Sequence, residues 1–169
     1  AYQVDVAGTG FVKANTADDD WTVLPDEYKQ TIAAGTASPS VALFADEWVG
    51  YGDAIDYRKL TVNQTGSYDF TISGVENAVT LTLYTVNAKG ALTKGKSVSV
   101  NGTKSTSGTI SGVLVDAGTE LYVAVTAAGA KTGKNSAYQV DVTGTGFVKA
   151  NNADDDWTAL TSEYTISGT

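Results

Sequence analysis

The sequence predicts an all-β protein folded as an antiparallel β-sandwich of the jelly-roll kind. Val, Thr and Tyr are abundant and glycine occurs 18 times, a composition typical of short strands joined by turns. Apolar and polar residues alternate over short segments, as expected for strands with one buried face. Turn residues recur about every ten positions, and no segment keeps a helical period of about 3.6 residues over ten positions.

The expected strands follow one another along most of the chain, and their alternate apolar residues should form a core between two sheets. The segment Ala33–Ser40 is small, polar and proline-containing, which is typical of a loop. Asn101-Gly102 predicts a type I′ hairpin turn, because both residues tolerate positive φ. The expected strands are Tyr2–Val6, Asp56–Val62, Ser67–Ser73, Ala78–Val86, Ser97–Val100, Thr109–Val115, Glu120–Ala128 and Tyr138–Val142.

A long internal repeat indicates how the chain is organised. Ala1–Leu24 returns as Ala137–Leu160, 136 residues later, and only three of the 24 positions differ: Ala7/Thr143, Thr16/Asn152 and Val23/Ala159. A period of this length is that of a domain, and it predicts a tandem array. Residues 1–10 would close the preceding repeat, 11–146 would form a complete sandwich with an acidic linker at 13–21, and 147–169 would begin the next repeat.

The duplicated strand also suggests partners. Because Tyr2–Val6 and Tyr138–Val142 have the same sequence, either copy can in principle occupy the same place in its own unit or in another molecule, which is the logic of strand exchange. The expected partners are therefore neighbouring repeats or identical subunits.

Composition excludes several classes of function. The net charge of −8 disfavours binding to nucleic acid and to anionic membranes, and no apolar run approaches the roughly 18 residues that cross a membrane. The chain has no Cys and no His, which removes disulfides and the Ser-His and Cys-His catalytic systems. A carboxylate pair remains conceivable, but the acidic residues lie in linker runs and at strand starts. We therefore expect a protein that is not an enzyme.

Two acidic clusters are candidates for a metal site. The first contains Asn15, Asp18, Asp19 and Asp20 in the linker, and the second contains Asp53 and Asp56. Consecutive carboxylates repel one another unless a cation or hydrogen-bond donors compensate them, and Ca²⁺ takes six to eight oxygen ligands. The alternative is a solvated acidic turn in which Asp20 bonds its own backbone. The EF-hand and RTX repeat patterns are absent.

Several segments together resemble the bacterial pre-peptidase C-terminal (PPC) domain family: Gly52–Val62 (GDAIDYRKLTV), Gly66–Ser73, Val79–Val86, Leu121–Ala127 and Ala137–Val142. The resemblance implies a β-sandwich of jelly-roll type, found at the ends of secreted peptidases and in arrays in large surface proteins. In the similar collagen-binding domains of clostridial collagenases, calcium lies between an acidic segment and the Asp residues of a D-x-x-D-Y strand.

Carried over to this chain, the resemblance implies that Ca²⁺ is held by residues of both acidic clusters. The copied run Asp154–Asp156 has no D-x-x-D-Y strand after it, so we expect it to form an incomplete site. The implied ligands are Asn15, Asp18, Asp19, Asp20, Asp53 and Asp56.

The function expected from these observations is that of a structural or adhesive repeat module outside the cell or on the bacterial surface. Calcium would stiffen the junction between repeats. The alternative is a targeting module that holds a secreted enzyme on collagen, polysaccharide or cell wall. Trp48 and Tyr51 would then form its ligand platform, joined by Trp21 and Phe44, although aromatic residues in a sandwich also commonly belong to the core.

Overall fold

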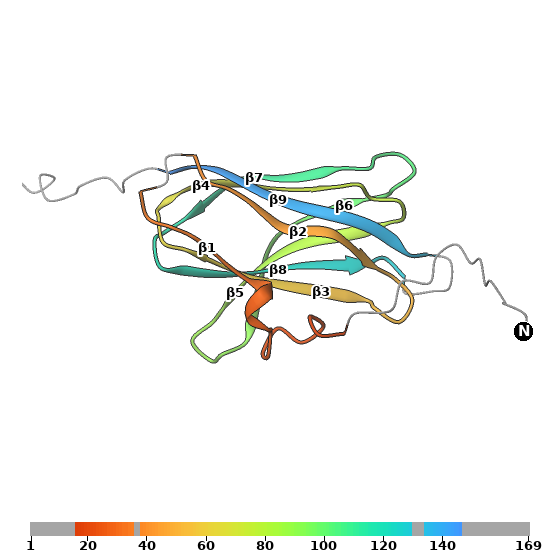
Figure 1. The fold of residues 1–169 in the computed structure, drawn as a ribbon, viewed down its shortest axis with the longest axis horizontal. Helices are drawn as coiled ribbons and strands as arrows, with labels where there is room; N and C mark the ends of the chain where they lie inside the picture. Colours follow the sequence, from red (N-terminus) through yellow and green to blue (C-terminus); the bar gives the residue numbers. More distant parts are fainter. Residues whose placement is uncertain (1–15, 36–37, 130–133, 147–169) are drawn as a thin grey trace, which may run out of the picture.

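The computed structural model describes residues 16–35, 38–129 and 134–146, which form a two-layer β-sandwich (Figure 1). The first sheet has the strand order β1-β3-β8-β5-β6 and the second has the order β2-β9-β4-β7. The predicted all-β sandwich is therefore confirmed. Among the described residues, no helix is long and apolar enough to span a membrane. The elements are η1 (Asp26–Tyr28), β1 (Lys29–Ile32), β2 (Ser40–Val49), β3 (Ile55–Val62), β4 (Gly66–Ser73), β5 (Val79–Val86), β6 (Leu92–Val100), β7 (Gly108–Val115), β8 (Thr119–Ala127) and β9 (Ser136–Gly146).

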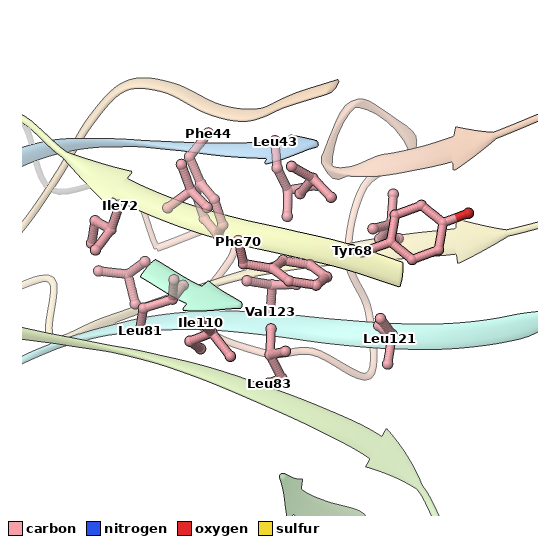
Figure 2. Packing of buried hydrophobic residues seen from close by; sticks show 14 of the residues in the cluster. Leu43, Phe44, Tyr68, Phe70, Ile72, Leu81, Leu83, Ile110, Leu121 and Val123 are labelled. Carbon is pink, nitrogen blue, oxygen red and sulfur yellow. The ribbon is translucent and has the colours of Figure 1, made fainter. Parts of the chain in front are cut away.

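The core forms where the alternating residues of the two sheets meet. Tyr68, Phe70 and Ile72 of β4 are fully buried, as the alternation predicts, and they lie opposite Leu81 and Val123 of the other sheet (Figure 2). Burial of such side chains, at roughly 25 cal/mol per Å² of apolar surface, is the main stabilising contribution in a domain of this kind.

The alternation does not predict β1 and β2. The pairing of β2 with β9 shifts register between Ala42 and Phe44 and again between Phe44 and Glu47, and Asp46 has a positive φ of 53°. These bulges break the period of two that identifies a strand in a sequence. The four-residue strand β1 pairs with β3 in parallel, so the sandwich is not antiparallel throughout.

The predicted hairpin at Asn101-Gly102 is wrong. The strands on either side, β6 and β7, lie in different sheets, so residues 101–107 cross between the layers. Gly102 has a φ of +79°, whereas Asn101 is not among the residues with positive φ. A Cβ atom on Gly102 would overlap the carbonyl oxygen of Glu76. Glycine is therefore required here by close backbone packing as well as by the turn.

The described chain enters and leaves the sandwich at opposite ends of β3. The backbone N–H of Tyr57, near the start of β3, donates a hydrogen bond to the carbonyl oxygen of Asp18 at 2.9 Å. Gly146, at the end of β9, pairs with Gly66, which follows the end of β3. An eight-residue strand is about 26 Å long. The acidic linker and the exit of β9 are therefore separated by most of the length of the domain.

Candidate metal centre

The acidic linker is held against the start of β3 by three kinds of contact. The first is the backbone hydrogen bond from Tyr57 to Asp18. Trp21 packs edge-on against Tyr122 of β8, with ring centroids 5.1 Å apart and an interplanar angle of 77°. Leu24 is buried as well. The backbone of Asp18 and the residues that follow the aspartate run are thus fixed to the sandwich, which constrains where the carboxylates point.

Four aspartates from two distant segments meet at this end of β3. One carboxylate oxygen each from Asp18, Asp19 and Asp56 lies within 4.8 Å of the others. The carboxyl of Asp53 is close enough to hydrogen-bond with those of Asp19 and Asp56. Asp18, Asp53 and Asp56 are at most 2% exposed, and Asp19 is half-buried. The structure therefore brings together four of the six residues singled out from the sequence.

The other candidate ligands are not part of this cluster. Asp20 is exposed, and its carboxylate accepts hydrogen bonds from the backbone N–H of Thr22 at 2.9 Å and from its hydroxyl at 2.6 Å. These bonds lower the pKa of Asp20, which is the behaviour of an acidic turn. Asn15 and the copied run Asp154–Asp156 lie outside the described residues.

Arg58 is a central residue of the cluster that the sequence reasoning missed. Its side chain is only 3% exposed and donates to Asp18 Oδ2 and, at 2.6 Å, to Glu47 Oε1. The guanidinium lies 3.9 Å from the ring centroid of Tyr28 and 4.5 Å from that of Phe44. The alternation of β3 contains the signal, because a charged residue two positions after Asp56 must face the interior with it.

Ionising all the carboxyls of the cluster together, with no cation beside them, is energetically unfavourable. The pKa of Asp56 is raised to about 9, chiefly by burial; a hydrogen bond from the Tyr138 hydroxyl lowers it in part, and the negative charges of Asp18 and Asp53 contribute to the rise. The pKa of Asp19 is also raised, by burial and by the charge of Asp18. Without a bound cation, Asp56 is therefore protonated at neutral pH.

Two buried oxygens of the cluster lack donors. Asp18 Oδ1 and Asp19 Oδ1 accept no hydrogen bond within the described part of the chain, and a buried acceptor without a partner is costly. Ca²⁺ binds oxygen at about 2.3–2.6 Å, so ligands on opposite sides of one ion are about 4.6–5.2 Å apart. The spread of the carboxylate oxygens, up to 4.8 Å, fits such an ion, and an all-oxygen donor set suits a hard cation.

The raised pKa of Asp56 predicts how stability depends on pH when divalent cations are absent. Between the ordinary pKa of about 4 and the folded value of about 9, the folded state holds a proton that the unfolded state has lost. The free energy of unfolding should therefore be highest at the acidic end of this window and fall as pH rises through it. Urea unfolding at pH 5, 7 and 9 measures this slope. Asp56→Asn, which cannot ionise, should flatten it, and an equal slope in that variant would contradict the assignment.

The aromatic candidates do not form a single platform. Phe44 lies in the core, with its ring centroid 5.5 Å from that of Tyr138, so its expected place in an exposed platform is wrong. Trp21 packs on Tyr122 of the five-stranded sheet. Trp48, on β2, is half-buried, and Tyr51 in the following turn is 61% exposed. Trp48 and Tyr51 therefore remain as candidates for a ligand surface.

Comparison with known proteins finds no matching family model and no matching curated protein. Among solved structures, the chain is similar to part of tripeptidyl peptidase 2, at 11% sequence identity over 68% of this chain, with a TM-score of 0.45. The chain spans 10% of the length of that protein chain.

Proposed function

We propose that this chain is a non-catalytic structural module of an extracellular repeat protein, in which one Ca²⁺ ion fastens the acidic linker to the sandwich. The observation that carries the proposal is the meeting of Asp18 and Asp19 from the linker with Asp53 and Asp56 beside β3. The buried oxygens Asp18 Oδ1 and Asp19 Oδ1 accept no hydrogen bond within the described part of the chain. The resemblance of Asp53–Tyr57 to the D-x-x-D-Y strand of PPC domains supports calcium as the ion.

The ion would act by replacing protons and removing repulsion. Arg58 supplies one positive charge to the cluster, on the side of Asp18 and Glu47. A divalent cation among the remaining carboxylate oxygens would compensate the charges that Arg58 does not reach. Because the ion binds only where the linker and β3 are already together, its binding free energy also stabilises the fold.

The position of the cluster means that holding the linker there would also affect how neighbouring repeats are oriented. The linker enters at the start of β3, whereas β9 ends beyond the other end of that strand. If each repeat holds its linker in this way, every junction has a fixed entry at one end of a domain and a fixed exit at the other. An array with such junctions would behave as a stiff rod, whereas free linkers would leave the domains as flexibly joined beads.

Isothermal titration with CaCl₂ at pH 7 tests the proposal. We expect one site in the wild type and a loss of at least about tenfold in affinity in Asp19→Asn and in Asp53→Asn, because each removes a charged oxygen ligand. Asp20→Asn is the matched control, since Asp20 belongs to the same run but not to the cluster. No binding by the wild type at millimolar calcium, or an equal loss in Asp20→Asn, would contradict the proposal.

A second candidate function, attachment to an insoluble polymer, is favoured by the exposure of Tyr51. Co-sedimentation with collagen, cellulose and cell-wall preparations tests it. If this surface binds polymer, the Tyr51→Ala variant should no longer sediment with it. The control variant Leu114→Ala changes a residue that is 75% exposed on β7, and it should still sediment with the polymer.

A further inference from the structure

We propose that the side of the sandwich formed by β6 and β7 docks against the side formed by β1 and β2 in a second copy of the chain, so that copies associate side by side. This inference goes beyond the calcium-fastened module, which concerns how one linker is held within one copy. It would stand if the acidic cluster bound no ion, because it rests on the charges of the two sides.

The sandwich has two open sides, because each sheet ends in an edge strand on either side. β1 and β2 are the edge strands of one side, where the side-chain amide of Gln30 donates to the carbonyl oxygen of Ala42 at 3.0 Å. β6 and β7 are the edge strands of the other, where Lys96 Nζ donates to the carbonyl oxygen of Ser111 at 3.2 Å. A contact between two such different surfaces would be heterologous.

The β6/β7 side is basic. From Asn87 to Val115, a segment that contains both strands, the sequence has four lysines and no acidic residue. Lys89 and Lys94 form no ion pair with any described residue, so their charges are available to a partner. All four lysines are exposed: Lys89, Lys94, Lys96 and Lys104.

The β1/β2 side is acidic. Residues 16–53, which contain the linker and both strands, have eight acidic residues and one lysine. The side remains acidic when the buried members of the metal cluster are set aside, because four of its acidic residues are exposed: Asp20, Asp26, Glu27 and Asp46. Charge complementarity between the two sides therefore favours a second copy of the same chain as the partner.

A groove on the β6/β7 side supplies an apolar surface beside the lysines. It has a volume of about 400 Å³ and is lined by Leu83 and Leu121 of one sheet and by Val113 of the other. Leu114, which also lines it, is 75% exposed. On the acidic side, Val23 of the linker is 69% exposed. Both sides thus offer apolar surface that a contact would remove from water.

The edge strands are poorly suited to backbone pairing with another chain. The pairing of β4 with β7 shifts register between Tyr68 and Phe70, and Lys96 Nζ covers the carbonyl oxygens of Ser111 and Gly112 at 3.2 and 3.5 Å. On the opposite side, β2 is bulged twice and β1 has only four residues. Such features protect sheet edges from strand addition. We therefore expect the copies to meet through side chains.

Salt distinguishes this contact from non-specific association. Each copy has a net charge of −8, so copies repel one another on average, and added salt should weaken that repulsion. Opposite charges that meet across an interface instead lose attraction as salt rises. Association that weakens with salt, in spite of the net charge, is therefore the expected signature.

Sedimentation equilibrium of the full chain measures this signature, with a chelator present so that the calcium site has no influence. We expect the average mass to rise past that of a dimer as the concentration approaches about 1 mM, because a heterologous contact does not close. The mass should fall between about 10 mM and 0.1 M NaCl, where the Debye length shortens from about 30 to about 10 Å. A chain that stays monomeric, or that associates more strongly at the higher salt, overturns the inference.

Charge reversal tests which surfaces meet. Lys89→Glu/Lys94→Glu and Asp26→Lys/Glu27→Lys change exposed residues and make the two sides more alike in charge, so each should weaken association at least about tenfold. Combining all four changes exchanges the charges at these positions and leaves the net charge at −8. The combined variant should associate again. Failure to recover, in a variant that melts like the wild type, overturns the inference.

Carbodiimide cross-linking of the wild type gives a second measurement, because it joins a lysine amine directly to a carboxylate. In an equal mixture of isotopically labelled and unlabelled chains, mass spectrometry identifies the links between copies. These links should join Lys89 or Lys94 to the exposed acidic residues of the β1/β2 side. Links between copies that are confined to other pairs would overturn the inference.

Discussion

Calcium at 1 mM should raise the melting temperature of the chain by about 4 °C at pH 7, and chelation should reverse the change. For a dissociation constant of about 0.1 mM, within the range of calcium sites in extracellular modules, a tenfold excess of ligand stabilises the folded state by about 1.4 kcal/mol. For a domain of this size, each kcal/mol shifts the melting temperature by about 3 °C. Differential scanning calorimetry with and without chelator measures the shift.

The source of that shift can be located with variants of single aspartates. Asp53→Asn should remove most of the calcium-dependent stabilisation, whereas Asp20→Asn should retain it, because Asp20 is exposed and bonded to Thr22. Mg²⁺ should give a smaller shift than Ca²⁺, since it prefers a compact octahedral shell and keeps several waters. A calcium shift that survives Asp53→Asn undiminished would show that the ion acts elsewhere.

The parts of the fold that the sequence predicts are those in which alternation is uninterrupted. β3 and β4 alternate strictly between interior and surface, and the expected strands agree with them to within one residue. β2 escapes prediction because its two bulges let neighbouring residues such as Leu43 and Phe44 both be buried. β6 pairs with the preceding strand β5, whereas β7 pairs with the more distant β4 in the other sheet, so the local turn signal at Asn101-Gly102 was a poor guide to the pairing of β7.

Some residues of the candidate site can likewise be recognised from short stretches of sequence, whereas others are brought together only by the fold. The aspartates are visible in the sequence because each cluster is a short run. Asp20 stays outside the site because a hydrogen bond to its own neighbour competes with the cluster. Arg58 is harder to find, since its acidic partners lie 40 and 11 residues away, in the linker and in the opposite sheet. Only the three-dimensional fold brings these charges together.

Arg58→Met should lower the free energy of unfolding by about 3–5 kcal/mol in the absence of calcium, the usual result of removing one partner from a buried ion pair. The change keeps an unbranched side chain of similar length but leaves the fully buried Asp18 carboxylate without its cation. Lys59→Met is the matched control on the same strand. Lys59 pairs with Glu120 at 2.6 Å, but both side chains are partly exposed, and such pairs contribute about 0–1 kcal/mol.

Calcium should then distinguish the two roles of Arg58. The guanidinium holds the linker to both sheets, but it also occupies Asp18 Oδ2 and adds positive charge beside the proposed ion. Without it, Asp18 has both oxygens available, so the stabilisation by 1 mM Ca²⁺ should be larger in Arg58→Met than in the wild type, although the calcium-free variant is less stable. Urea unfolding with and without chelator measures both quantities. Equal calcium effects in the two proteins would mean that Arg58 and the ion do not compete for Asp18. A variant as stable as Lys59→Met without calcium would mean that the buried guanidinium is not what holds the linker in place.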